Sequence, residues 1–209
     1  MAKEWESIEH ALHYLGRADQ IPHRTEGESV LLEEVPSQSQ RILDIGAGDG
    51  RLLDLCLLKC PIAHGVAMDF SPPMLKKLRN KYGKEGSVSV VQHDINRPLP
   101  PSLGSFDVIV SSFAVHHVND NRKHKLYEEV WQILDDGGVF CNLEHVSSPT
   151  ANLHEKFFTA MGMTLADEDK SNILLDVETQ LGFLRKIGFE DVDCYWKWRE
   201  LALLIGKKA

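Results

Sequence analysis

The sequence has few cysteines, no long hydrophobic run and no excess of positive charge. Four cysteines in 209 residues are too few for a disulfide framework. No window approaches the roughly 18 consecutive apolar residues that a membrane-spanning helix requires, so no membrane association is expected. The 23 lysines and arginines are outnumbered by 31 aspartates and glutamates, which gives a formal charge of −8. This balance argues against avid binding to nucleic acid or to an anionic membrane.

The remaining composition is that of a globular protein. With 43% hydrophobic residues the chain can build a sizeable core, and its length fits one domain spanning residues 1–209. Glu4 and Glu6 stand where a secretory signal needs a basic end and an apolar run, so the expected location is cytoplasmic. Residues 1–35 are expected to form one or two helices outside the core. Either a monomer or a homodimer is compatible with these features.

Residues 41–140 alternate short apolar runs with amphipathic stretches, a pattern that predicts a parallel sheet covered by helices on both faces. Strands are predicted at 41–45, 63–68, 87–92, 106–111 and 139–143, and helices at 51–59, 74–82 and 125–134. Asn119 or Asp120 is expected to cap the third of these helices, and Asp135–Gly138 to form the turn after it. The fold class is therefore doubly wound α/β.

The C-terminal region predicts one more helix and a strand pair. Residues 178–187 form an amphipathic pattern that ends at Gly188, and the runs 192–198 and 201–205 are close enough to pair antiparallel. Trp196 and Trp198 alternate on one face of the first run, which favours packing beneath a helix.

The strongest chemical signal is the run Gly46-Ala47-Gly48-Asp49-Gly50, between a predicted buried strand and a helix. Alternate glycines let the backbone approach a ligand closely, and the N–H groups at a helix start can point at it. The spacing differs from the Gly-x-Gly-x-x-Gly of dinucleotide sites. Asp44, two positions before the first glycine, would repel phosphate and attract an ammonium group. A tight crossover without a ligand is the alternative.

Two further acids end predicted strands. Asp69 is placed to accept hydrogen bonds from both hydroxyls of a ribose, or else to cap the next helix. Because Ser71 is expected to supply that cap, the ribose role is favoured. Asp94 can accept from an exocyclic amino group of adenine while Ile95 packs on the base.

In this order the motifs resemble the class I S-adenosylmethionine-dependent methyltransferases, across roughly residues 41–145. The resemblance implies a Rossmann-like, seven-stranded, mostly parallel sheet with an antiparallel C-terminal strand. It implies S-adenosyl-L-methionine as cofactor, with direct displacement at the sulfonium methyl. The cofactor-binding residues it implies are Asp44, Gly46, Ala47, Gly48, Asp69, Phe70, Met74, Asp94, Ile95, Ser111 and Phe113.

The acceptor is expected to be a small molecule with an oxygen, sulfur or carbon nucleophile. Relatives that methylate amide nitrogens often carry Asn-Pro-Pro-Tyr after the fourth strand, whereas this chain has Ser111-Ser112-Phe113-Ala114. A non-catalytic S-adenosylmethionine-binding regulator and an RNA methyltransferase are the alternatives. The glycine spacing and Asp44 argue against a nucleotide-dependent oxidoreductase.

Four side chains are candidates for a general base at the carboxyl edge of the sheet. His116 and His117 follow the fourth strand, and Glu144 and His145 end the fifth. Each could instead satisfy a backbone group or pack on the cofactor. No metal site is predicted, because neither Cys56 with Cys60 nor His145 with His154 and Glu144 completes a ligand set.

Two segments are expected to border the acceptor pocket. Residues 146–176 occupy the place where this family inserts a substrate-covering segment. Its apolar side chains form either a pocket wall or the buried face of a helix, namely Phe157, Phe158, Met161 and Met163. Tyr14, His23 and Arg24 lie before the first strand, in a region that could border the site. Arg24 could pair there with a carboxylate of the cofactor or substrate, or these residues could form a solvated helix end.

Overall fold

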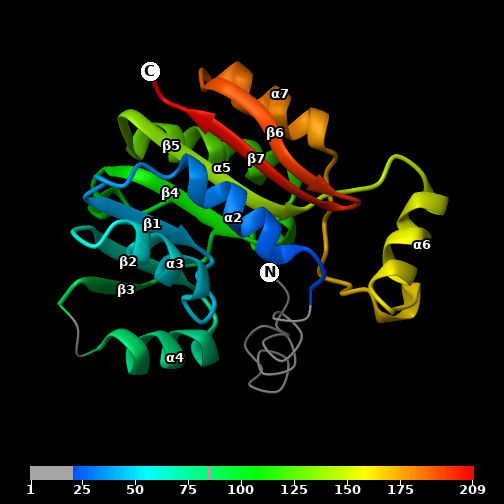
Figure 1. The fold of residues 1–209 in the computed structure, drawn as a ribbon, viewed down its shortest axis with the longest axis horizontal. Coiled ribbons are helices and arrows are strands. Elements are labelled where there is room, and N and C mark those ends of the chain that lie inside the picture. Colours follow the sequence, from blue (N-terminus) through cyan, green and yellow to red (C-terminus); the bar gives the residue numbers. More distant parts are fainter. Residues whose placement is uncertain (1–20, 84–85) are drawn as a thin grey trace.

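The sheet has seven strands in the order β3-β2-β1-β4-β5-β7-β6 (Figure 1). The computed structural model describes residues 21–83 and 86–209. The strands are β1 (Arg41–Ile45), β2 (His64–Asp69), β3 (Val88–Gln92), β4 (Phe106–Ser112), β5 (Leu134–His145), β6 (Glu190–Trp198) and β7 (Leu201–Lys207). Strands β1 to β5 pair in parallel, and β7 pairs antiparallel with both β5 and β6. The predicted fold class is confirmed, including its antiparallel C-terminal strand.

Helices cover both faces of this sheet (Figure 1). They are α2 (Arg24–Glu34), α3 (Arg51–Lys59), α4 (Pro72–Tyr82), α5 (Asp120–Ile133), α6 (Ala151–Ala160) and α7 (Val177–Ile187), with short 3-10 turns η2 (Pro101–Leu103), η3 (Val115–His117) and η4 (Leu165–Asp167). Helices α2, α3 and α4 share one core cluster, and α5 and α7 share the other. Helix α6 stands apart, beyond the end of the sheet (Figure 1). No helix of the described ranges is long and apolar enough to cross a membrane.

Strand β1 shows why the central strands are held firmly. Ile42 belongs to the same buried cluster as Leu53 of α3, and Leu43 belongs to the same buried cluster as Leu126 of α5. All four of these side chains are at most 1% exposed, and burial of each contributes about 1.5 to 3 kcal/mol. The carboxyl ends of β1 and its neighbours are therefore fixed, and the candidate site lies at these ends.

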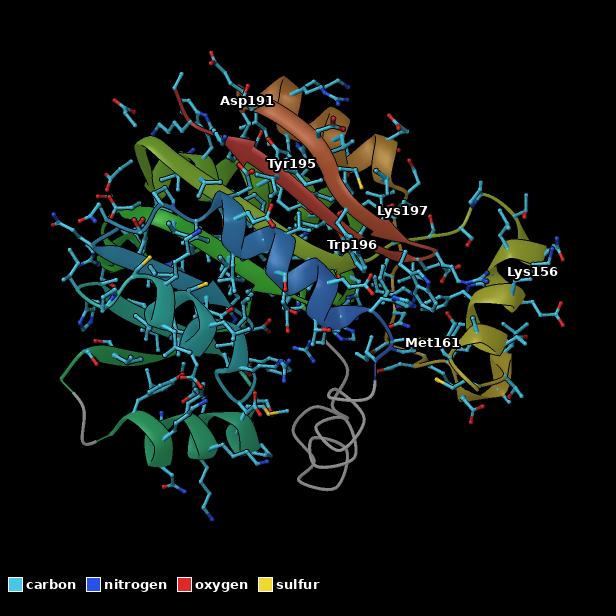
Figure 2. The ribbon with its side chains drawn as sticks, in the orientation of Figure 1. Lys156, Met161, Asp191, Tyr195, Trp196 and Lys197 are labelled. Atoms are coloured by element: carbon cyan, nitrogen blue, oxygen red, sulfur yellow. The ribbon has the colours of Figure 1, made fainter. Side chains whose placement is uncertain are left out.

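The C-terminal hairpin of β6 and β7 packs against α2. Its tryptophans, Trp196 and Trp198, lie beneath this helix, as predicted. A Cβ atom on Gly27 of α2 would lie 2.9 Å from the Trp196 ring, so only glycine lets the helix approach this closely. Figure 2 labels Trp196 on β6, which runs beside β7. The Trp198 ring lies 4.6 Å from the His23 ring at the start of α2. Residues 1–20, including Tyr14 and most of the predicted N-terminal helices, lie outside the described residues.

The predicted turn at Asp135–Gly138 is wrong, because these residues belong to β5. Gly137 donates a hydrogen bond to the Lys208 carbonyl (2.7 Å), and Lys208 donates one to Gly138 (2.9 Å). The pairing of β4 with β5 shifts register here, and Gly137 has a φ of 78° that permits the bulge. Helix α5 also starts five residues earlier than predicted, at Asp120, with Asn119 as its cap.

The segment between β5 and α7 contains α6, whose apolar face is turned inward. Phe157 and Phe158 are each 4% exposed. Met161 and Met163 are partly buried against the same core cluster. Of the two alternatives for these four side chains, the structure supports the buried face of a helix.

Candidate active site

The three glycines of the turn between β1 and α3 all have left-handed backbones, with φ of 72° at Gly46, 59° at Gly48 and 83° at Gly50. A Cβ on Gly46 would lie 2.3 Å from the Ala114 side chain, and one on Gly50 would lie 2.3 Å from the Tyr82 hydroxyl. A Cβ on Gly48 would meet nothing within 4 Å. Gly46 and Gly50 therefore allow close packing, whereas Gly48 borders open space that a ligand could fill.

The N–H groups at the start of this turn do not point at a ligand, contrary to the prediction. Gly46 and Ala47 both donate to the carbonyl of Met68, at 2.8 and 2.9 Å. Gly48 donates to the Asp69 carboxylate at 2.9 Å. The part of the turn that remains open to a ligand is the surface at Gly48.

Asp69, at the end of β2, ties the glycine turn to the start of α4. One oxygen accepts from Gly48, and the other accepts from the Ser71 N–H at 2.8 Å. Burial raises the pKa of Asp69 to about 6, although these backbone hydrogen bonds lower it. Ser71 is the N-cap residue of α4, as predicted, but its side chain makes no cap hydrogen bond. Near this turn Met74 is 2% exposed and Phe70 is half-buried.

Asp94 follows β3 in a loop that α5 holds in place. Its Oδ1 accepts from the backbone and side-chain nitrogens of Asn96, at 2.9 and 3.0 Å. Ile95 is buried, and Arg122 of α5 donates to its carbonyl at 2.6 Å. Glu129 fixes the Arg122 guanidinium through two contacts of 2.7 Å. Arg122 was not predicted from the sequence, although Glu129 stands seven residues later on the same helix face.

Asp44 lies on β1 with its carboxylate almost fully buried. It is 1% exposed, and its Oδ2 has no hydrogen-bond partner among the described residues. Burial, and then the charge of Asp69, raises the pKa of Asp44 to about 7, while Arg24 lowers it. An unpaired buried carboxylate oxygen fits an ammonium group, which would hydrogen-bond to it and favour its charged form.

Arg24 of α2 is buried beside this carboxylate. Its Nε donates to Glu28 at 2.8 Å, and its guanidinium carbon lies 5.4 Å from the Phe113 ring centre. Arg51 of α3 binds Glu28 through two contacts of 2.9 Å. The structure thus decides against a solvated helix end for Arg24.

The end of β4 is fixed by its own backbone. The Ser111 hydroxyl donates to the Ile45 carbonyl at 2.8 Å, so its hydrogen bond joins the ends of β4 and β1. Phe113 is 7% exposed and has a φ of 53°, which is rare for a residue other than glycine. Its N–H donates to the Leu143 carbonyl at 2.9 Å. This strained backbone directs the chain from β4 into η3.

His116 and Glu144 form a buried pair at the carboxyl ends of β4 and β5. Nδ1 of His116 lies 2.5 Å from Oε1 of Glu144, which also accepts from the His145 N–H at 2.8 Å. The other Glu144 oxygen, Oε2, has no partner among the described residues. Burial raises the pKa of Glu144 to about 7 and lowers the pKa of His116 well below its usual range. At neutral pH His116 is therefore uncharged, while Glu144 is ionised in part of the population.

The His117 ring packs against the His116 ring at an angle of 49°, with the two ring centres 4.0 Å apart. Its Nδ1 lies 3.0 Å from the hydroxyl of Ser171. Burial, and then the neighbouring His116, lowers the pKa of His117 to about 3. Asp169 opposes this shift without reversing it.

A buried lysine fastens the segment around Ser171 to η3. Nζ of Lys123 donates to the carbonyls of Val118 and Ile173, at 2.5 and 2.6 Å. Ile173 donates in turn to the His116 carbonyl at 2.8 Å. Lys123 was missed, although it shares the apolar i, i+3, i+4, i+7 face of α5 with Leu126, Tyr127 and Val130.

His145 is hydrogen-bonded to the carboxylate of Glu200, a residue that was not predicted from the sequence. Its Nε2 lies 3.0 Å from Glu200, and Nδ1 of His154 lies 2.9 Å from the same carboxylate. Glu200 is fully buried in the link between β6 and β7. Glu144 is therefore not the shared partner of the two histidines.

The four candidate bases thus converge at one edge of the sheet, with the His116 and His145 ring centres 5.7 Å apart. The described residues contain no group of three or more His, Cys, Asp or Glu side chains arranged to hold a metal ion. Cys56 and Cys60 are buried free thiols. A buried carboxyl whose pKa lies near 7, hydrogen-bonded to an imidazole, can accept or relay a proton.

The comparisons with known proteins point to one family. A family model described as a methyltransferase domain matches residues 42–138. The ubiquinone/menaquinone biosynthesis C-methyltransferase UbiE of Ruegeria sp. (strain TM1040) is 26% identical over 186 residues, covering 81% of this chain and 74% of that protein. The demethylmenaquinone methyltransferase of Clavibacter sepedonicus is 30% identical over 173 residues, covering 76% and 69%.

The structural comparison shows the same fold. An O-methyltransferase family protein from Burkholderia thailandensis matches with a TM-score of 0.76 and 16% identity, over 98% of this chain and 61% of that one. This chain therefore spans less than two thirds of that neighbour. With S-adenosylmethionine as its cofactor, the chain belongs to the class I S-adenosylmethionine-dependent methyltransferases.

Proposed function

We propose that this chain transfers the methyl group of S-adenosylmethionine to a small-molecule acceptor whose nucleophile must first lose a proton. The observation that carries the proposal is the buried pair of His116 and Glu144, which lies at the sheet edge that also carries the glycine turn. S-adenosylmethionine supplies a methyl group on a positively charged sulfur. Its leaving group is already activated, so the protein contributes mainly alignment and proton removal.

The residues at the ends of β1, β2 and β3 fit this cofactor. Asp44, with its unpaired Oδ2, would hold the ammonium group, and the open space over Gly48 would admit the chain that carries it. Asp69 would accept from the ribose hydroxyls with the lone pairs that Gly48 and Ser71 leave unused. Asp94 and Ile95 would border the adenine.

The ends of β4 and β5 would bind the acceptor and remove its proton. A general base works best when its pKa lies near the working pH, and that of Glu144 is about 7. His116 shares a hydrogen bond with Glu144 and could pass the proton to it. We place this pair, with His117 and His145 beside it, as the proton-accepting group.

The acceptor class follows from several features together. One of the relatives described above is named as a C-methyltransferase of ubiquinone/menaquinone biosynthesis, and the other as a demethylmenaquinone methyltransferase. The charge of −8 and the absence of Asn-Pro-Pro-Tyr after β4 favour a small molecule over nucleic acid. We therefore infer an acceptor with an acidic hydroxyl, phenol or enol, methylated at that oxygen or at an adjacent carbon. The segment 146–176 would cover it.

The test is transfer of a labelled methyl group to a panel of phenols, enols, thiols and amines. We expect phenols or enols to be methylated, and Glu144→Gln to lower kcat by about 100-fold or more while cofactor affinity stays unchanged. Acceptors with a lower hydroxyl pKa should depend less on Glu144, because they lose the proton unaided. Turnover unaffected by the substitution, or transfer to amines alone, would contradict the proposal.

A further inference from the structure

The carboxylate of Glu200 joins two parts of the molecule that are far apart in sequence. It accepts from Nε2 of His145, at the end of β5, at 3.0 Å. It also accepts from Nδ1 of His154, on α6, at 2.9 and 3.2 Å. A third hydrogen bond comes from the side chain of Ser148. The carboxylate thus connects the candidate base cluster to the segment that stands beyond the sheet.

The position of Glu200 is set by the backbone around it. Its carbonyl accepts from the Val146 N–H at 2.8 Å, directly after His145. Leu201, the next residue, pairs with His145 in the ladder between β5 and β7. Arg199, the residue before it, has a φ of 54° that a two-residue link between strands demands. The Glu200 side chain is therefore held beside the His145 ring.

The charges around this carboxylate favour its ionised form. Burial raises the pKa of Glu200, but the hydrogen bonds from His145, Ser148 and His154 outweigh it, and the pKa is lowered overall. Burial lowers the pKa of His154, yet Glu200 and then Glu168, whose Oε2 lies 3.5 Å from Nε2, raise it overall. An ionised Glu200 accepts hydrogen bonds only, so Nε2 of His145 carries the proton.

The other ring nitrogen of His145 can accept a proton. Nδ1 makes no hydrogen bond within the described residues, and it is not among the fully buried unpaired atoms. The ring packs against Phe157 of α6, with centres 5.2 Å apart. Nδ1 is thus the ring nitrogen of His145 that remains to accept a proton. Figure 2 labels Lys156 and Met161 on this segment, to one side of the sheet.

We propose that Glu200 is a positioning residue for methyl transfer. It keeps His145 in the tautomer whose Nδ1 accepts a proton, and through His154 it couples that orientation to the docking of α6. Its part in catalysis rests on the proposed function. The tautomer and the docking do not, and they can be measured without any acceptor.

The experiment records long-range ¹H–¹⁵N spectra of the full chain labelled at histidine. We expect wild-type His145 to show a protonated Nε2 and an unprotonated Nδ1. In Glu200→Gln the two nitrogen signals should move toward each other, because the amide no longer selects one tautomer. Glu190→Gln makes the same chemical change at the exposed far end of the hairpin and should leave both signals unchanged.

Amide exchange in α6 measures the second half of the proposal. Glu200→Gln should speed exchange in residues 151–160 by about tenfold or more, and Glu190→Gln should not. The rings of His64 and His93, near β2 and β3, report whether the fold is intact. An unchanged His145 tautomer, or unchanged exchange in α6, would overturn the role of Glu200.

An activity measurement separates this proposal from the proposed function. If labelled methyl groups are transferred, Glu200→Gln should lower kcat at least about tenfold with cofactor affinity unchanged. His154→Gln should raise KM more than it lowers kcat, because His145 keeps its carboxylate while α6 loosens. If no acceptor is methylated, the proposed function fails, and the spectra still decide whether Glu200 positions His145.

Discussion

The two halves of the carboxyl edge of the sheet are built in different ways. At the ends of β1, β2 and β3, backbone groups dominate: three left-handed glycines and the N–H groups that Asp69 accepts from. At the ends of β4 and β5, side chains dominate, and they come from η3, β5, α6 and the link between β6 and β7. The first half is built mainly from backbone groups of neighbouring strands and turns, whereas the second is built from side chains of four separate parts of the fold.

In the proposed function the first half binds the cofactor, and the second half binds the acceptor and removes its proton. The histidine cluster has buried groups whose pKa values are moved far from their usual ranges, which is typical of sites that handle protons. Substitutions in the two halves should therefore have different consequences.

The largest expected effect is that of Gly46→Ala. The new Cβ would lie 2.3 Å from the Ala114 side chain in a left-handed backbone. The backbone costs about 1 to 2 kcal/mol and the overpacking about 1 to 3 kcal/mol. Gly48→Ala is the matched control, because it has the same backbone cost and no neighbour within 4 Å. In chemical denaturation Gly48→Ala should unfold at a higher denaturant concentration than Gly46→Ala. Calorimetry should show that both variants bind the cofactor more weakly than wild type. Equal free energies of unfolding would contradict this assignment.

Glu144→Gln should change how stability depends on pH. The folded-state pKa of Glu144 is about 7, which exceeds the ordinary value of 4.5. The contribution of this carboxyl to the free energy of unfolding is therefore complete below pH 4.5 and is lost as the pH rises through 7. At 1.36 kcal/mol per pKa unit the loss amounts to about 3 kcal/mol. Denaturation between pH 4.5 and 8 should show that wild type loses more stability than the glutamine variant. Parallel pH profiles would show that Glu144 is not buried as described.

Asp69→Ala should weaken cofactor binding by about 1 to 3 kcal/mol, through the lost hydrogen bonds to ribose. Asp136→Ala, which removes an acid that is 85% exposed at the opposite end of β5, is the control and should bind as wild type does. Calorimetry measures both. Unchanged affinity of Asp69→Ala would remove this residue from the cofactor site.

The smallest expected effect is the release of less than one proton per molecule from Asp44 when the cofactor binds. Asp44 has a pKa of about 7 in the free protein, so near pH 7 part of the population is protonated. An ammonium group beside it would lower that pKa and release the proton on binding. Binding enthalpies in buffers of different ionisation enthalpy should reveal this release, and Asp44→Asn should abolish it. Proton uptake in its place would argue against an ammonium group at Asp44.

The sequence predicted the fold because the fold follows from local patterns, whereas the cofactor roles of the first half stay predictions. Gly46, Asp69 and Asp94 occupy positions that follow from strand ends alone. The direction of the turn N–H groups could not be predicted, because Gly46 and Ala47 donate to Met68 on a neighbouring strand. Such a contact depends on register between strands, which residue spacing does not give.

In the second half the sequence identified the histidines but not their partners. His116, His117, Glu144 and His145 follow strands, so their edge of the sheet was predictable. Glu200 stands in the link of a hairpin, and nothing in its own neighbourhood indicates that it meets His145, 55 residues away. Only the antiparallel pairing of β5 with β7 brings them together.

The most direct test of the cofactor site is a calorimetric titration of the full chain with S-adenosylmethionine, S-adenosylhomocysteine and NAD in parallel. We predict that both sulfur nucleotides bind and that NAD does not, since the Asp44 carboxylate would repel a pyrophosphate. Binding of NAD alone would contradict this prediction and would mean that the glycine turn holds a different ligand.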